Sequence, residues 1–165
     1  MNTVRTRGYT LIELMVVVAI VGVLAAIVYP LYTDSVLKGK RAQGRTALAE
    51  LLQQQERYLT QRNCYLSFTS STSGVATAAS SCGATPPSVP MKAFSGDTMG
   101  NSAYTLSAGA CPADGNGVVP ALSECVQVSA TPLGPDPKVG VLSLTSTGVK
   151  SCTGTAGATS SACWP

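Results

Sequence analysis

One apolar stretch near the N-terminus constrains this chain more than any other feature of its sequence. The residues from Leu14 to Val28 read LMVVVAIVGVLAAIV, fifteen positions without a polar side chain, and the mainly apolar character begins at Tyr9. A helix of about 20 residues is about 30 Å long, which matches the hydrocarbon core of a bilayer. Burial of such a helix in a small soluble domain would require apolar neighbours on every side. The stretch therefore predicts a membrane-spanning helix.

The residues that flank this stretch argue against an ordinary secretory signal. Such a signal ends at a cleavage site marked by small residues, whereas Tyr29-Pro30-Leu31-Tyr32 follows here. A short basic segment with Arg5 and Arg7 precedes the stretch. We therefore expect the helix to remain on the mature protein as an anchor.

Glu13 is the one charged side chain within the apolar stretch. A charged residue at the centre of a membrane helix costs about 2.5–3.5 kcal/mol, so Glu13 is a candidate functional residue. The alternative is that Glu13 lies at the level of the lipid headgroups and is simply hydrated, since an acidic residue is favourable in the first turn of a helix.

The sequence from Arg7 to Pro30, which begins RGYTLIE, resembles the class III leader and N-terminal helix of type IV pilins and pseudopilins. The resemblance implies that prepilin peptidase removes the leader by cutting after Gly8. It further implies N-methylation of the new first residue, Tyr9, where the family usually has Phe. Glu13 then corresponds to the family's signature acid, with a role in assembly. The freed amine needs a partner in an apolar setting, and a carboxylate four residues on, in the same or a neighbouring subunit, can supply one.

The six cysteines predict a disulfide framework in an oxidising compartment. Their number is even, none forms a C-x-x-C pair, and the chain has no His, which argues against a zinc site. Short loops cost the least entropy to close, so pairing of neighbours along the chain is favoured, while crossed pairs among the first four cysteines stay open. The favoured pairs are Cys64–Cys82, Cys111–Cys125 and Cys152–Cys163.

The sequence after Pro30 predicts an α+β domain. A helical pattern with one apolar face continues over residues 31–59, and residues 60–98, rich in Ser, Thr, Ala and Pro, are expected to form an irregular loop. Short links between the later strands favour a small antiparallel sheet packed on the amphipathic half of the helix. Strand-like runs occupy residues 103–107, 125–130 and 139–144, with a short return beginning near Val149.

This organisation comprises a leader (1–8), a transmembrane or filament-core helix (9–29) and a periplasmic or extracellular globular domain (30–165). It is similar to the type IV pilin fold. Three further segments, at the helix end, in the sheet and at Cys163-Trp164, more weakly resemble minor pilins of the PilE type. The disulfides require the globular domain to lie outside the cytoplasm, so we expect a single-pass inner-membrane protein before assembly and an extracellular pilus afterwards.

The resemblance implies a structural, minor subunit of a type IV pilus, assembled with other pilins at an inner-membrane platform for adhesion, twitching motility or DNA uptake. A pseudopilin of a type II secretion system is one alternative, and a DNA- or surface-binding module at a pilus tip is another. Nucleic-acid binding has weak support, because no aromatic residue interleaves with the basic cluster of the helix. That cluster is Lys38, Lys40, Arg41 and Arg45.

Composition argues against an enzyme. The absence of His removes Ser–His and Cys–His nucleophilic pairs together with the commonest metal ligand. Charged residues are 12% of the chain and the formal net charge is only +3, so no broad nucleic-acid surface is implied. We therefore expect no catalysis, no metal and no cofactor.

Overall fold

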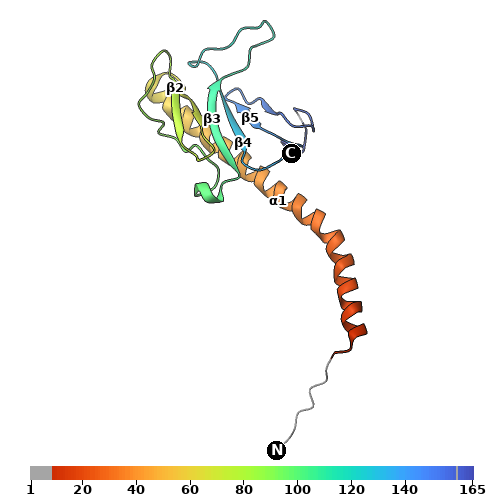
Figure 1. The fold of residues 1–165 in the computed structure, drawn as a ribbon. Helices are drawn as coiled ribbons and strands as arrows, with labels where there is room; N and C mark the ends of the chain where they lie inside the picture. Colours follow the sequence, from red (N-terminus) through yellow and green to blue (C-terminus); the bar gives the residue numbers. More distant parts are fainter. Residues whose placement is uncertain (1–8, 159) are drawn as a thin grey trace, which may run out of the picture. The chain divides into compact units, whose positions relative to one another are not determined.

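The computed structural model describes residues 9–158 and 160–165 (Figure 1). The chain divides into two compact units between Lys38 and Gly39, here named the N-terminal unit and the C-terminal unit. A single α-helix, α1, runs from Leu11 to Arg62 and contributes to both units, and it is not interrupted at Pro30.

The N-terminal unit exposes its apolar side chains. Every large apolar side chain from Tyr9 to Val28 is at least half exposed. The most apolar window of α1 has a mean hydropathy of 3.0 and no buried residue, so by length and composition the helix can cross a membrane. An apolar surface of this extent requires lipid or other apolar helices to cover it.

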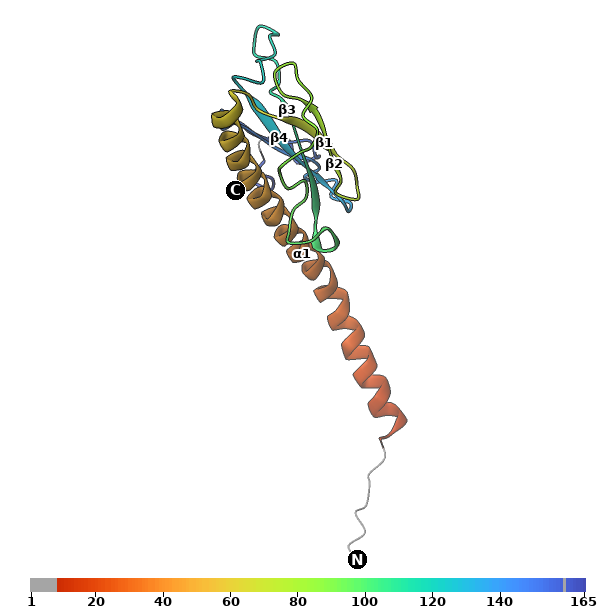
Figure 2. The same cartoon turned by 90° about the vertical axis from the view of Figure 1, so that its left-hand side faces the viewer.

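The C-terminal unit is a six-stranded antiparallel sheet with the second half of α1 laid on one face (Figures 1 and 2). The α+β arrangement expected from the sequence is confirmed. The strand order is β2-β1-β3-β4-β5-β6. The strands are β1 (Ser67–Ser70), β2 (Ala76–Ser80), β3 (Tyr104–Ala110), β4 (Val126–Pro132), β5 (Leu142–Thr145) and β6 (Lys150–Cys152), and a 3-10 helix, η1 (Met99–Asn101), precedes β3.

The core lies between α1 and the central strands. Strands β3 and β4 pair in register from Tyr104↔Pro132 to Ala110↔Val126, so their alternate side chains point to the same face. On that face lie apolar side chains, while Ser and Thr dominate the other. The largest fully buried apolar side chains are Leu48, Leu51, Leu66, Phe68, Tyr104, Leu106, Val126, Val128, Val139 and Leu142.

Gly44 allows a buried aromatic ring to lie against the helix. A Cβ atom at position 44 would be 2.9 Å from Cε2 of Tyr104 and 3.3 Å from Cδ1 of Leu142. Gly39, on the same helix, has nothing within 4 Å of the corresponding position. The two glycines therefore separate the effect of packing from the effect of helix propensity.

We expect Gly44→Ala to lower the thermal stability of the full-length protein in detergent and Gly39→Ala to raise it. Alanine favours a helix by about 0.8–1.0 kcal/mol over glycine at either position. At position 44 overpacking costs about 1–3 kcal/mol and should exceed that gain. Equal stabilisation by both substitutions would contradict the close packing of Tyr104 on the helix.

The prediction of an irregular loop over residues 60–98 is wrong in its first half, up to Ser80. Helix α1 continues to Arg62, and β1 and β2 follow within the segment. Strand β2 reads ATAAS, in which small residues give almost no apolar alternation, although its pairing with β1 is clear.

The run at 139–144 yields a strand only from Leu142, because Gly140 turns the chain at a φ of +63°.

Candidate functional site

The N-terminal end of α1 carries the residues predicted to act in processing and assembly. Gly8 lies outside the described residues, and Tyr9 is 85% exposed just before the helix. The backbone N–H of Glu13 donates a hydrogen bond to Oγ1 of Thr10 at 3.3 Å. Thr10 is thus the N-cap of α1, and prediction from sequence missed it, although the Thr-x-x-Glu spacing is typical of a helix start. The cap fixes where the helix begins and leaves the Glu13 side chain exposed among apolar neighbours.

A buried ion pair ties the helix to the loop between β4 and β5. Nε and Nη2 of Arg41 donate to Oδ2 and Oδ1 of Asp136, both at 2.7 Å. The two side chains are only 9% and 4% exposed. The hydrogen bond from Arg41 lowers the pKa of Asp136, against the opposing effect of burial. The sequence groups Arg41 with Lys38, Lys40 and Arg45 in one basic cluster, but the structure buries Arg41 against Asp136, whereas Lys38 and Lys40 are exposed.

Polar residues of the same helical segment hold two further parts of the chain. The Gln43 side chain accepts hydrogen bonds from Ser95 Oγ and from the N–H of Ala103, and Arg45 donates to the carbonyl of Cys163 at 3.1 Å. Next to Gln43 is an open cavity of about 230 Å³, and its one lysine, Lys92, already donates to a carbonyl of its own loop. These contacts fix the sheet and the C-terminal tail on the helix.

All six cysteines are paired, each with its neighbour along the chain. The three disulfides close the helix–β2 region, the loop between β3 and β4, and the C-terminal tail. The bonds are Cys64–Cys82, Cys111–Cys125 and Cys152–Cys163, with sequence separations of 18, 14 and 11.

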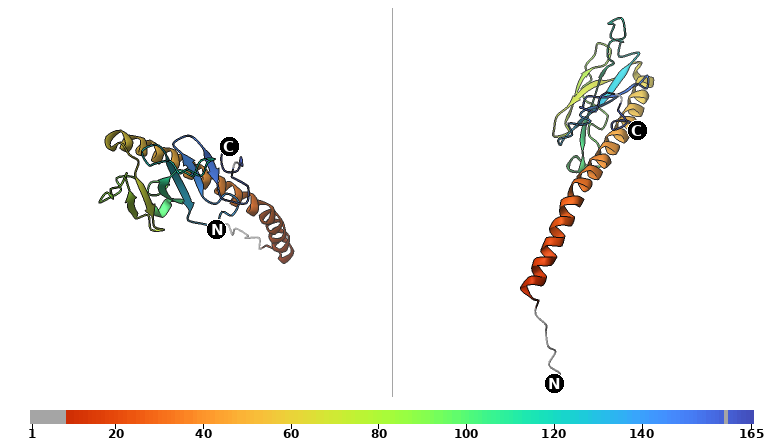
Figure 3. Two further views of the ribbon diagram at one scale, coloured as in Figure 1. Left: turned by 90° about the horizontal axis from the view of Figure 1, so that it is seen from above. Right: turned by 90° about the vertical axis from the view of Figure 1, so that its right-hand side faces the viewer.

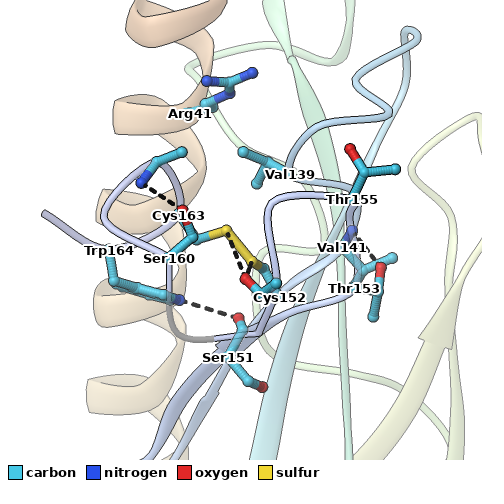
Figure 4. Close-up of a disulfide and its surroundings, with 12 residues drawn as sticks. Arg41, Val139, Val141, Ser151, Cys152, Thr153, Thr155, Ser160, Cys163 and Trp164 are labelled. Carbon is cyan, nitrogen blue, oxygen red and sulfur yellow. Dashed lines mark hydrogen bonds between the residues drawn. A yellow bond between two sulfur atoms is a disulfide. The ribbon is translucent and has the colours of Figure 1, made fainter.

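The last of these disulfides fixes the tail beside β6 (Figure 4). Nε1 of Trp164 donates to the carbonyl of Ser151 at 3.0 Å, and Nζ of Lys150 lies 5.4 Å from the centre of the Trp164 ring. The tail therefore keeps an aromatic ring against the core with a cation above it.

The charged and hydroxyl side chains of the C-terminal segment, residues 137–165, are all Lys, Ser and Thr. No Asp or Glu follows Asp136, whereas Lys138 and Lys150 do, with ten Ser and Thr residues among positions 137–165. Both lysines are exposed. Arg45 reaches the same segment through its bond to Cys163. This group of three cations, Arg45, Lys138 and Lys150, is named the basic side.

Within the residues that the structure describes, no group of His, Cys, Asp and Glu side chains has the arrangement of a metal site. The features described above are an apolar helix with one acid, three disulfide-closed segments and the basic side.

Two family profiles match the chain. Residues 4–29 match the family described as the prokaryotic N-terminal methylation motif. Residues 30–138 match the family described as type IV minor pilin ComP, DNA uptake sequence receptor. The two matches meet at Tyr29 and Pro30 and together cover most of the chain.

Curated relatives match chiefly over short segments. The type IV major pilin protein PilA of Myxococcus xanthus is 41% identical over 64 residues, which are 39% of this chain and 29% of that protein. Fimbrial protein EcpB of Eikenella corrodens is 56% identical over 36 residues, 22% of this chain and 23% of its own. The type IV major fimbrial protein FimA of Dichelobacter nodosus is 53% identical over 38 residues, which are 23% of this chain and 24% of that protein. The chain thus spans less than a third of the length of these relatives, and no solved structure matches it significantly.

Proposed function

Because the chain belongs to the type IV pilin family, whose minor-pilin profile covers residues 30–138, we propose that it is a subunit of a type IV pilus, of the minor class. The observation that carries the proposal is the capped, exposed apolar half of α1 with its single acid, followed by a separately folded unit closed by disulfides. The first feature needs lipid before assembly and neighbouring helices afterwards. The second suits a domain presented to the medium.

In the proposed function the chain is first a membrane protein and then a filament subunit. Residues 1–8 act as the leader, residues 9–29 span the inner membrane, and residues 30–165 fold in the periplasm, where disulfides form. After cleavage at Gly8 and N-methylation of Tyr9, the helix leaves the bilayer and packs among the helices of other pilins. Glu13 then accompanies the new amine in a setting of low dielectric, where an unpaired charge is costly.

Replacement of Gly8 by valine should leave an uncleaved, membrane-bound precursor that does not appear in sheared filaments. The residue before the cut must fit the peptidase, and a branched side chain there should block cleavage. Thr6→Val, within the same leader, is the matched control and should be processed normally. Immunoblots of membrane and sheared fractions give the result. A wild-type chain that is cleaved but stays in the membrane fraction, with none in the sheared fraction, would favour a pseudopilin of type II secretion.

A second candidate function is DNA binding by the assembled subunit. The minor-pilin profile is described as a DNA uptake sequence receptor. The basic side supports it, because Lys138 and Lys150 belong to a segment, residues 137–165, that has ten Ser and Thr residues and no Asp or Glu, and Arg45 donates to the carbonyl of Cys163 in that segment. Such groups contact phosphates, which position a protein on DNA and make binding salt-dependent.

We expect Lys138→Ala and Lys150→Ala each to weaken DNA binding by the full-length protein in detergent. Loss of one phosphate contact should reduce the slope of log affinity against log salt by about 1. Arg57→Ala, an exposed cation elsewhere on α1, is the control and should leave the slope unchanged. Gel shifts at several salt concentrations measure this, and equal slopes for all variants would exclude the basic side.

A further inference from the structure

Two adjacent residues near the end of the chain connect two cations of the basic side. The C-terminal end lies beside the part of α1 that belongs to the C-terminal unit (Figures 2 and 3). Nη1 of Arg45 donates to the carbonyl of Cys163 at 3.1 Å, and Nζ of Lys150 lies 5.4 Å from the centre of the Trp164 ring. Cys163 and Trp164, here named the tail pair, therefore contact one cation from the helix and one from β6.

The tail pair is itself held at two points. Cys163 is fully buried and is joined to Cys152 of β6 by a disulfide. Nε1 of Trp164 donates to the carbonyl of Ser151 at 3.0 Å, and the half-buried ring packs against the core (Figure 4). The position of the ring is thus set by the disulfide, the hydrogen bond and the core.

The contacts with the tail pair leave both cations able to bind an anion. Lys150 is exposed, and a cation–π contact orients its ammonium group without using up the three N–H donors. Arg45 is half-buried and has five N–H donors, of which the bond to Cys163 uses one. Immobilising a long side chain on binding costs about two- to tenfold in affinity, and a contact that orients the side chain beforehand reduces this loss.

We propose that the tail pair positions these two cations for the phosphates of DNA. Trp164 orients Lys150 over its ring. The carbonyl of Cys163 orients Arg45 beside the helix. The disulfide Cys152–Cys163 keeps both contacts in place, and the tail pair itself does not touch DNA. The proposal rests on the DNA-binding function proposed above and names the residues and the bond on which the affinity of that surface depends.

Trp164→Leu tests the orientation of Lys150. Leucine keeps an apolar contact with the core but has no π face, so binding of duplex DNA by the full-length protein in detergent should weaken about two- to tenfold. The slope of log affinity against log salt should change little, because Lys150 still reaches a phosphate. Trp164→Phe retains a ring face and should bind more tightly than Trp164→Leu. Gel shifts at several salt concentrations give both quantities.

A double variant decides whether Trp164 acts through Lys150. In the Lys150→Ala background, Trp164→Leu should cause no further loss of affinity. No loss in the wild-type background, or an equal loss in both backgrounds, would overturn the proposal, since Trp164 would then be dispensable, contact DNA itself or act only through the fold. Absence of DNA binding by the wild type would instead contradict the DNA-binding function on which the proposal rests.

Cys152→Ser combined with Cys163→Ser tests the role of the disulfide. This tail variant should bind DNA more weakly than Trp164→Leu, because both cations lose their orientation. Trp164 is the only tryptophan of the chain, so its fluorescence reports directly on the tail. We expect its emission to shift to longer wavelength in the tail variant as the ring becomes exposed to water.

The matched control is Cys111→Ser combined with Cys125→Ser, which removes the disulfide of the loop between β3 and β4. This control should change neither the DNA affinity nor the tryptophan emission. Wild-type affinity in the tail variant, or the same loss of affinity in both double variants, would overturn the role of the Cys152–Cys163 disulfide in DNA binding.

Discussion

Glu13→Val should enter the membrane normally and fail to enter filaments. The substitution removes a charge from an apolar helix, which makes insertion into lipid more favourable. In the filament it removes the carboxylate that accompanies the new amine of Tyr9, and loss of one partner of a buried charge pair costs about 2–5 kcal/mol. Incorporation should therefore fall at least about tenfold. The ratio of the chain in sheared filaments to that in membranes measures the effect.

Two controls separate assembly from folding in this experiment. The C-terminal unit has its own core and begins at Gly39, so its disulfides and protease resistance should not change in Glu13→Val. Asp34→Val removes an exposed acid from the same N-terminal unit outside the apolar stretch and should leave incorporation near the wild-type level. Normal incorporation of Glu13→Val would show that the acid has no role in assembly.

Asp136→Ala should destabilise the C-terminal unit by about 3–5 kcal/mol, because it leaves the Arg41 guanidinium buried without its bidentate partner. A loss of this size is a large part of the stability of a typical domain, about 5–15 kcal/mol. Thermal unfolding of the full-length protein in detergent measures it. Replacing both partners, Arg41→Met with Asp136→Leu, should cost less than the single change, because no buried charge remains. A single variant as stable as the wild type would contradict the burial of this pair.

The same pair should make the wild type sensitive to acid. Pairing lowers the pKa of Asp136 in the folded state below its ordinary value of 3.8. The stabilisation is therefore present above about pH 4 and is lost as the pH falls through the folded-state pKa. Between pH 5 and pH 2 the wild type should lose more stability than Asp136→Asn, which has no carboxyl group at this position.

The features that sequence predicted well are those set by local pattern. The apolar stretch is marked by an uninterrupted run of apolar residues, whereas the amphipathic second half of α1 and the alternating runs of β3 and β4 are marked by their periodicity. The structure contains all of them. Strand β2 was missed because Ala and Thr give no apolar contrast, so its pairing with β1 depends on a neighbour and not on its own composition.

The candidate site shows the same difference between features set by the local sequence and features set by the tertiary fold. Glu13 stands out because it interrupts an apolar run, and Thr10 was recognisable from its spacing to Glu13. The burial of Arg41 could not be predicted, since its partner Asp136 is 95 residues away and only the tertiary fold brings them together. The exposed loop between β3 and β4 likewise became visible only when the structure placed Val118 and Val119 beyond a closed disulfide.

The mass of the mature chain in purified sheared filaments tests the central claim most directly. We predict a polypeptide that begins at Tyr9, carries one methyl group on its terminal amine, and contains three intact disulfides. Such a mass, measured before and after reduction, would place the chain in the filament as a processed pilin subunit. A chain that retains Met1, or that is cut after Val28 and so has lost its apolar helix, would contradict it.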